Sequence, residues 1–276
     1  MEQEIQLRVY RPSSGSFVTG VKEIWQFREL IFFFALRNIV VRYKQTIVGV
    51  GWAIIQPLFS SGVAAVVFGH FAKLPSEGSA YMAFVMCGVI PWKAFETAMT
   101  GASNSVTSEG GILQKVYFPK LTAVFSTLGV TLVDSFLQLF LLVIVLLVYN
   151  EPITMWLLLT PIVVLWAAMT GIAFGIWLAP LNVKFRDVRY ALPFVLQIWM
   201  YAAPVVYSSE IVPKDKLFWY QLNPLNPIIE TFRGLALGNN HLSLQSAVIA
   251  VTLTLLVLVS GIKFFKKMES TFADEI

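Results

Sequence analysis

Long apolar stretches recur along this chain and are separated by short polar segments. A helix needs about 20 mostly apolar residues to cross the hydrocarbon core of a bilayer. Six stretches of this kind contain almost no Asp, Glu, Lys or Arg, and they cover residues 45–72, 78–108, 121–150, 152–183, 190–209 and 234–262. The pattern therefore predicts an all-α membrane protein with six transmembrane helices. Asn150, Glu151 and Pro152 predict a short turn between the third and fourth helices.

The region between the fifth and sixth stretches, residues 207–243, is apolar but broken by Pro213, Pro224 and Pro227. Its pieces are too short to cross a bilayer. Backbone of this kind is tolerated at membrane depth only where protein or a water-filled cavity covers it. We therefore expect short re-entrant or interfacial helices on one side of the membrane.

Residues 20–44 precede the first stretch and predict an amphipathic helix. On a helical wheel one side carries Lys22, Gln26, Glu29, Arg37 and Lys44. The other side carries Ile24, Phe27, Ile31, Phe34, Ala35 and Ile39. Such a helix lies in the interface of a membrane with its apolar side toward the lipid. The alternative is a helix that only anchors the N-terminal segment.

Composition supports a membrane protein. Hydrophobic residues make up 57% of the 276 residues and charged residues 13%, with a mean hydropathy of +0.72. Soluble domains carry about 25% charged residues, so an ordinary soluble enzyme and a disordered chain are excluded. Cys87 is the only cysteine, which excludes a disulfide framework. We expect a cytoplasmic segment over 1–46, a transmembrane domain over 47–263 and a cytoplasmic tail over 264–276.

The distribution of Lys and Arg predicts the orientation. Fifteen of the 20 basic residues fall in four segments that alternate with the spans, at 1–46, 107–120, 184–189 and 263–276. Cytoplasmic segments carry an excess of Lys and Arg, so both termini are predicted to be cytoplasmic. The basic residues punctuate apolar stretches rather than forming a dense patch, so no nucleic-acid partner is expected despite the net charge of +4.

Catalytic signatures are missing from the sequence. It contains no G-x-x-x-x-G-K-[ST], no H-E-x-x-H and no G-x-S-x-G. His70 and His241 lie at the ends of predicted spans, where a lone histidine is usually structural. The sequence therefore predicts no enzymatic site, no cofactor and no metal on this chain. Energy for any transport would come from a partner or from an ion gradient.

Three ionisable residues, Lys93, Glu96 and Asp134, fall inside the predicted spans. Lys93 and Glu96 are three residues apart on a helix, so they can pair with each other. Asp134 could pair across helices, face a wet lumen or carry a proton. Three isolated charges do not resemble a proton wire.

Two further patterns concern packing. Gly171 and Gly175 form a G-x-x-x-G pattern, which allows close helix packing and is interpreted as a contact within the chain. In the loop 107–120, residues 112–118 predict a short helix that ends at Pro119. Exposed apolar residues in a cytoplasmic loop indicate a docking site for another protein. The alternative is a loop that folds back onto the bilayer.

Four groups of residues resemble polysaccharide-export ABC permeases, in order and at the expected spacing. They are Arg42-Tyr43-Lys44-Gln45-Thr46 with Gly49, Gly51, Trp52 and Gln56-Pro57; Lys115-Val116-Tyr117-Phe118-Pro119-Lys120; Leu181-Asn182-Val183-Lys184-Phe185-Arg186-Asp187-Val188; and Ala203-Pro204-Val205-Val206-Tyr207 with Asn223-Pro224 and Phe232-Arg233. The pattern is most similar to the O-antigen lipopolysaccharide branch, and capsule and teichoic acid permeases are relatives. Two departures are Lys93 in the P-W-x-x-F stretch and Ser208, where Pro is common.

The resemblance implies the ABC-2 (type V exporter) fold. It implies a homodimer around a lumen, docked to two separate ATP-binding cassette subunits that bind ATP and Mg. The implied ATPase-coupling residues are Arg37 and Arg42 on the interfacial helix and Ile112, Leu113, Lys115, Val116, Tyr117, Phe118 and Pro119 in the loop. The implied outer gate helices carry Tyr207, Trp219, Asn223, Pro224, Phe232 and Arg233.

A lumen for a long glycan should be lined by aromatic and small residues, because aromatic faces bury the C–H faces of sugars. The candidates for this lining are Trp52, Phe59, Trp199 and Tyr201. The alternative for each is packing between helices or contact with lipid.

The sequence thus predicts the permease subunit of an ABC exporter in a bacterial inner membrane. Its substrate would be an undecaprenyl-linked polysaccharide of O-antigen type, moved from the cytoplasm to the periplasm. One alternative is an ABC-2 permease for a drug or a small lipid. Another is a membrane-embedded glycolipid transferase, which should show a carboxylate pair or a histidine at one leaflet. The inner loops offer only Glu109 and Asp187, far apart in sequence.

Overall fold

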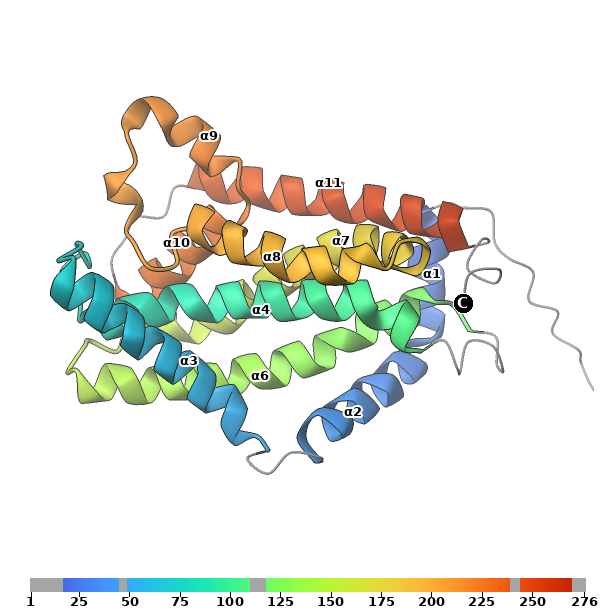
Figure 1. Cartoon of the computed structure of the whole chain (residues 1–276), viewed down its shortest axis with the longest axis horizontal. Coiled ribbons are helices and arrows are strands. Elements are labelled where there is room, and N and C mark those ends of the chain that lie inside the picture. Colours follow the sequence, from blue (N-terminus) through green and yellow to red (C-terminus); the bar gives the residue numbers. More distant parts are fainter. Residues whose placement is uncertain (1–16, 45–48, 110–117, 239–243, 270–276) are drawn as a thin grey trace, which may run out of the picture.

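The computed structural model describes residues 17–44, 49–109, 118–238 and 244–269. Every regular element within these ranges is a helix. The long helices run side by side along the longest axis of the molecule (Figure 1). We call the end where α4 finishes and α6 starts the Ser108 end, and the opposite end the Tyr81 end.

Helix α4 (Tyr81–Ser108) is the central column of the bundle. It packs against α7 (Thr160–Lys184) and α6 (Leu121–Val148), and its Tyr81 end also contacts α10 (Leu225–Leu237). Helix α11 (Leu244–Met268) covers α7 from the far side. The hydrophobic core therefore follows the α4–α7 contact along its length.

Four helices are long and apolar enough to cross a membrane within the described part of the chain: Gly51–Phe71, Leu121–Val148, Met155–Lys184 and Gln245–Met268. The first joins α3 (Gly51–Ala64) to the π-helix η1 (Ala65–Phe71), and the third joins η2 (Met155–Leu159) to α7. Helix α4 has 28 residues but contacts protein on most sides and carries small and polar residues. That α4 crosses the membrane stays a prediction. The same holds for α8 (Asp187–Ala202), which has 16 residues.

Two predicted boundaries were wrong. The fifth stretch, expected over 190–209, is helical only as far as Ala202, because Pro204 follows and the chain turns there. The sixth, expected from residue 234, begins at Leu244. Residues 234–237 belong instead to α10, which ends at Gly238 in the left-handed conformation (φ 76°) typical of a helix C-terminus.

Short helices occupy the proline-rich region, as the sequence predicts. After Ala203 come η3 (Ser209–Ile211), η4 (Lys214–Lys216), α9 (Leu217–Gln221) and α10. They cluster at the Tyr81 end, where α9 stands away from the bundle (Figure 1). The turn predicted after the third stretch is also present, with Asn150 at a positive φ of 55°.

The N-terminal amphipathic helix is two helices rather than one. The chain bends at Phe27 between α1 (Phe17–Gln26) and α2 (Arg28–Lys44). Ala35 and Ile39 of α2 approach Gly129 of α6, so the predicted apolar side packs on protein. The opposite side also exposes large apolar residues, namely Phe32, Phe33, Leu36, Val40 and Val41. The predicted apolar side is thus half-buried against α6.

The G-x-x-x-G pattern is a contact within the chain, as predicted. A Cβ atom on Gly171 of α7 would lie 2.4 Å from the carbonyl oxygen of Phe95, and one on Gly175 would lie 2.4 Å from the Cβ of Ala102. These glycines let α7 approach the backbone and the small alanine side chains of α4 closely.

We expect Gly171→Val to destabilise the bundle, because the new side chain would collide with backbone of α4. Overpacking of this kind commonly costs about 1–3 kcal/mol. Gly62→Val on α3 is the matched control, since a Cβ there meets nothing within 4 Å. Thermal unfolding midpoints in detergent measure both. Equal midpoints for the two variants would show that the α4–α7 contact tolerates separation.

Candidate functional site

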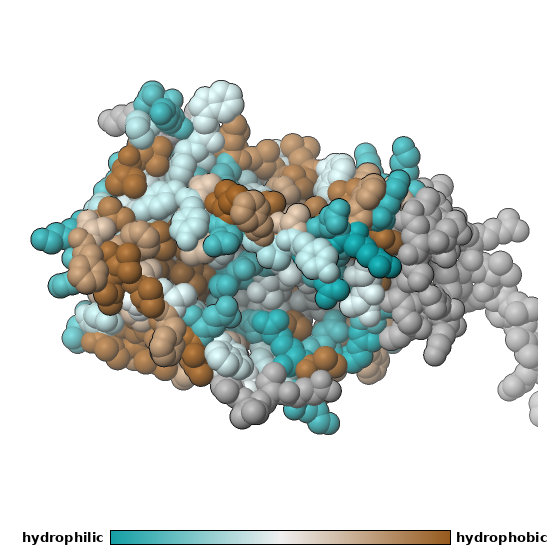
Figure 2. Space-filling model, viewed as in Figure 1, coloured by the Kyte–Doolittle hydropathy of each residue, from teal (hydrophilic) through white to brown (hydrophobic). Residues whose placement is uncertain are grey.

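A cavity of about 700 Å³ opens between α2, α3, α4 and α6. Its lining extends from Glu109 and Ala123, at the Ser108 end, to Lys93 and Gln138 near the middle of the bundle. Figure 2 shows hydrophilic side chains gathered over this part of the molecule, between hydrophobic surfaces on the neighbouring helices. Polar and charged residues make up much of its lining.

The polar lining comes from stripes on two helices. On α4 the stripe comprises Lys93, Glu96, Thr97, Thr100, Asn104 and Ser108, and on α6 it comprises Thr127, Asp134 and Gln138. These residues recur every three or four positions, so each set falls on one helix face. The search for charged residues in the sequence missed the hydroxyl and amide groups. Their helical spacing within an apolar stretch was the signal that could have found them.

Each carboxylate of the lining has a cationic partner. Lys93 Nζ lies 2.8 Å from Glu96 Oε2, which is the pairing that their spacing predicts. Arg42 of α2 reaches Asp134 Oδ2 at 2.6 Å. Glu109, at the end of α4, pairs with Arg37 of α2.

Asp134 both pairs across helices and faces the cavity, so two of its three predicted roles are present together. Besides Arg42, it accepts a hydrogen bond from the hydroxyl of Tyr43. Burial and this hydrogen bond raise the pKa of Tyr43 above its ordinary value, so the phenol stays a protonated donor. The arrangement is a fixed ion pair rather than an open proton site.

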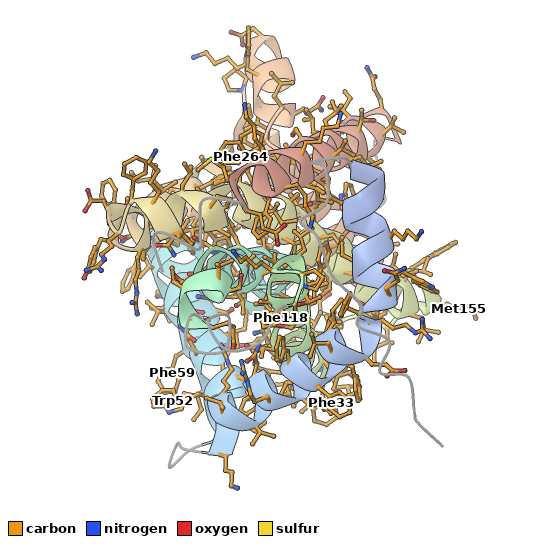
Figure 3. The ribbon with its side chains drawn as sticks, turned by 90° about the vertical axis from the view of Figure 1, so that its right-hand side faces the viewer. Phe33, Trp52, Phe59, Phe118, Met155 and Phe264 are labelled. Carbon is orange, nitrogen blue, oxygen red and sulfur yellow. The ribbon has the colours of Figure 1, made fainter. Side chains whose placement is uncertain are left out.

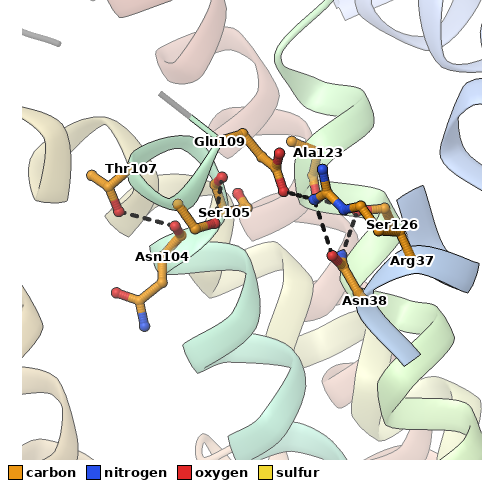
Figure 4. Close-up of polar contacts among 9 residues, drawn as sticks. Arg37, Asn38, Asn104, Ser105, Thr107, Glu109, Ala123 and Ser126 are labelled. Atoms are coloured by element: carbon orange, nitrogen blue, oxygen red, sulfur yellow. Dashed lines mark hydrogen bonds and ion pairs between the residues drawn. The ribbon is translucent and has the colours of Figure 1, made fainter. Parts of the chain in front are cut away.

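Arg37 and Arg42, which the resemblance implies as ATPase-coupling residues, are thus engaged within the chain. Figure 4 shows Arg37 between Asn38 and Glu109, and Asn38 Nδ2 in turn donates to Ser126 Oγ at 3.3 Å. Arg37 joins α2 to the end of α4, and Arg42 joins α2 to the middle of α6. Contact with another subunit through these groups stays a prediction.

The loop prediction falls mostly on residues 110–117, outside the described residues. It includes Ile112, Leu113, Lys115, Val116 and Tyr117. Phe118 is described, and the expectation that it is exposed was wrong: it is only 4% exposed and packs edge-to-face on Phe34 at a centroid distance of 5.2 Å. It lies inside the molecule in Figure 3, whereas Phe33 lies at the edge. Phe118 fills the gap between α2 and the start of α6, and Pro119 beside it is also buried.

Of the four candidate lumen aromatics, only Trp52 lines the polar cavity, with 55% of its surface exposed. Phe59 instead lines an apolar recess of about 560 Å³ on α3 and η1, with Val63 and Met82 among its neighbours. Tyr201 is exposed on α8, away from both recesses.

Trp199 packs between helices, which is the alternative to a place in the lumen, and its lumen role stays a prediction. Its ring packs edge-to-face on Phe95 and Phe174, with centroids 5.1 and 5.2 Å away. Its Nε1 donates to Asn223 Oδ1 at 3.0 Å. Trp199 therefore holds α8 against α4 and α7, because its flat apolar body and single donor are both satisfied by packing.

The predicted gate residues surround a buried arginine. Arg233 is 3% exposed and donates to the carbonyl oxygens of Pro204 at 2.5 Å and Val205 at 2.9 Å. It also reaches the carbonyl oxygens of Tyr207 and Phe84, and its guanidinium lies 3.7 Å from the ring centroid of Phe84. Arg233 thus fixes the segment after α8 onto α4.

The other gate candidates have mixed roles. Phe232 is fully buried, and Pro224 is buried at the start of α10. Asn223 Oδ1 accepts from the backbone N–H of Leu225 at 3.2 Å, which forms an Asx turn at the start of α10. Trp219 is exposed and Tyr207 is half-buried. Three of the five are therefore structural in this conformation, and motion of the gate stays a prediction.

Comparison with known proteins assigns the chain to a family. The ABC-2 type transporter family matches residues 29–237, which extend from α2 to the end of α10. The chain belongs to the ABC-2 type transporter family. The matched region contains the whole lining of the cavity and the Arg233 site. With its long apolar helices, this ABC-2 transporter chain is an integral membrane protein.

Individual relatives align along most of this ABC-2 chain. It is 23% identical over 258 residues to the O-antigen export system permease protein RfbA of Myxococcus xanthus, an alignment covering 93% of this chain and 98% of that protein. RfbA of Klebsiella pneumoniae is 23% identical over 239 residues, covering 86% and 91%. The polysialic acid transport protein KpsM of Escherichia coli is 24% identical over 203 residues, covering 72% and 77%.

We expect Arg233→Met to destabilise this ABC-2 chain strongly, because several buried carbonyl oxygens lose their donor. Each buried group left unpaired costs about 1–3 kcal/mol. The stability of Arg233→Lys should lie between that of Arg233→Met and that of the wild type, since an ammonium keeps the charge but reaches fewer carbonyls. Arg189→Met, on the exposed side of α8, is the control. Membrane protein level and unfolding midpoint report the effect. Wild-type stability of Arg233→Met would show that the segment after α8 is held by other contacts.

Proposed function

We propose that this chain is the transmembrane permease subunit of an ABC exporter for a lipid-linked polysaccharide of O-antigen type. The observation that supports this proposal most directly is the alignment with two O-antigen export permeases along more than nine-tenths of their length. The chain would move its substrate from the cytoplasmic to the periplasmic side of a bacterial inner membrane.

The cavity supports a carbohydrate substrate. Its lining is rich in hydroxyl and amide groups, which exchange hydrogen bonds with sugar hydroxyls. Trp52 offers an exposed aromatic face beside them, which can cover the C–H face of a sugar ring. Each such contact is weak, so a long glycan could slide past. The apolar recess at Phe59 would suit the lipid part of the substrate.

The finer architecture is part of the same proposal. Helices α4 and α8 would complete six spans, with the Ser108 end cytoplasmic because Lys120, Lys184 and Lys267 gather there. Two copies would form a homodimer around a joint lumen, and α9 and α10 would gate its outer end. Two ATP-binding cassette subunits, which bind ATP and Mg, would dock at the Ser108 end.

Two other functions receive less support. A glycolipid transferase needs an available acid or base, but each carboxylate of the described cavity lining is held by a cation. A permease for a drug or small lipid would use the apolar recess at Phe59 and would not need the larger polar cavity.

We expect deletion of the chain to remove polysaccharide from the cell surface and wild-type chain to restore it. Trp52→Ala should restore it several-fold less while protein level and ATPase co-purification stay normal, because the residue lines the cavity. Trp199→Ala should lower protein level instead, since large-to-small core changes commonly cost about 3–5 kcal/mol. Surface glycan and membrane protein are measured in parallel. Unchanged surface polysaccharide in the deletion strain would refute the proposed function.

We expect the two ends of α8 to lie on opposite sides of the membrane. In a Cys87→Ala background, Asp215→Cys and Pro152→Cys should react with an impermeant thiol reagent in intact cells, and Asp187→Cys only after permeabilisation. All three positions are exposed in the structure. Equal labelling of Asp187→Cys and Asp215→Cys in intact cells would rule out the crossing of α8 and with it the six-span arrangement.

A further inference from the structure

Gln138 is a buried amide whose oxygen has no hydrogen-bond partner among the described residues. It is 6% exposed, lines the cavity, and its Oε1 is fully covered. An unpaired buried acceptor costs about 1–3 kcal/mol. A leucine of similar size would avoid that cost. A half-turn of the amide exchanges its oxygen and nitrogen and brings the oxygen toward the cavity, so the unpaired oxygen indicates a ligand there that donates to it.

Gln138 stands in a cluster at mid-depth. It lies one turn beyond Asp134 on the same face of α6, close to the middle of that helix. Lys93 and Glu96 lie near the middle of α4, which packs against α6 and runs in the opposite direction. We call Lys93, Glu96, Asp134 and Gln138 the midpoint cluster; all four line the same cavity.

The cavity lining ends at this cluster. Beyond Lys93 toward the Tyr81 end, residues 83–92 of α4 are all buried in the core. A polymer that enters from the Ser108 end therefore meets the midpoint cluster at the innermost part of the cavity. The cluster is placed to contact whichever sugar arrives first.

The electrostatics of the cluster favour an uncharged ligand. Glu96 is paired with Lys93, Asp134 with Arg42, and Glu109 nearer the mouth with Arg37. No cation in the described lining is left without a carboxylate partner to hold an anionic group. Carboxylate oxygens retain spare lone pairs beside their ion pairs, so they can still accept from hydroxyl groups.

We propose that the midpoint cluster is a binding subsite for the hydroxyl groups of a neutral glycan and that it disfavours polyanionic glycans. The Gln138 carbonyl and the carboxylates of Glu96 and Asp134 accept from sugar hydroxyls, and Lys93 donates. This inference rests on the proposed function and narrows its substrate to uncharged sugars.

The first test measures binding to the permease purified with its ATPase in lipid nanodiscs. The probes are a neutral mannose oligosaccharide and a sialic acid oligosaccharide of equal length, observed by saturation-transfer NMR. We expect the wild type to bind the neutral probe and Gln138→Leu to bind it about tenfold more weakly, which corresponds to one lost hydrogen bond. Gln138→Leu should fold normally, since Oε1 loses no partner. Gln197→Leu, exposed on α8, is the control.

The second test changes the charge balance. Glu96→Gln leaves Lys93 unpaired, so we expect binding of the sialic acid probe to rise about tenfold or more. The double variant Lys93→Gln with Glu96→Gln restores neutrality and should lose that gain. The double variant also controls for a change of shape at position 96, because both variants carry the same side chain there.

The outcomes separate this inference from the proposed function. Wild-type permease that binds both probes equally, or Gln138→Leu that binds the neutral probe as the wild type does, would overturn the subsite. If the deletion strain still lost its surface glycan in those cases, the proposed function would stand. If deletion left the surface glycan intact, the proposed function would fail, whereas the probe measurements would still decide whether the cavity prefers neutral sugars.

Discussion

Helices α4 and α7 come into close contact at Gly171 and Gly175, where α4 presents backbone atoms and the small side chains of alanines. In a membrane, close contact of this kind replaces the hydrophobic drive that packs soluble helices. It makes α4 the column on which the other elements are arranged. The Tyr81 half of α4 is buried by this packing and by α10, and the Ser108 half turns a polar stripe toward the cavity. The core and the cavity therefore share one helix.

Ion pairs connect the surface helix α2 to that column and to α6. Arg37 and Arg42 are on α2, and their partners Glu109 and Asp134 are on α4 and α6. Removing one partner would leave the other charge unpaired, and the arginines are partly exposed, so solvent would screen part of that cost. The pairs hold α2 in register with the cavity helices. They also neutralise charges of the cavity lining.

Local sequence patterns predicted the features that depend on local chemistry. The length of the apolar stretches predicted the long helices, and the spacing of Lys93 and Glu96 predicted their ion pair. The prolines predicted the short helices after α8. Features that depend on distant neighbours were not visible. Nothing in the neighbouring sequence marks Trp199 and Phe118 as packed, because their partners, Phe174 and Phe34, come from other helices. The cavity was missed because its hydroxyl groups carry no charge.

The chain between Glu109 and Phe118 is attached to α2 at both ends. Glu109 is bound by Arg37, and Phe118 rests on Phe34, one helical turn away. The Arg37 guanidinium itself lies 5.0 Å from the centre of the Phe34 ring, so the two attachments touch each other. The two residues that flank positions 110–117 therefore meet the same turn of α2. Five residues further along this helix, Arg42 pairs with Asp134, halfway down α6, so one helix joins the rim of the cavity to the depth where its lining ends.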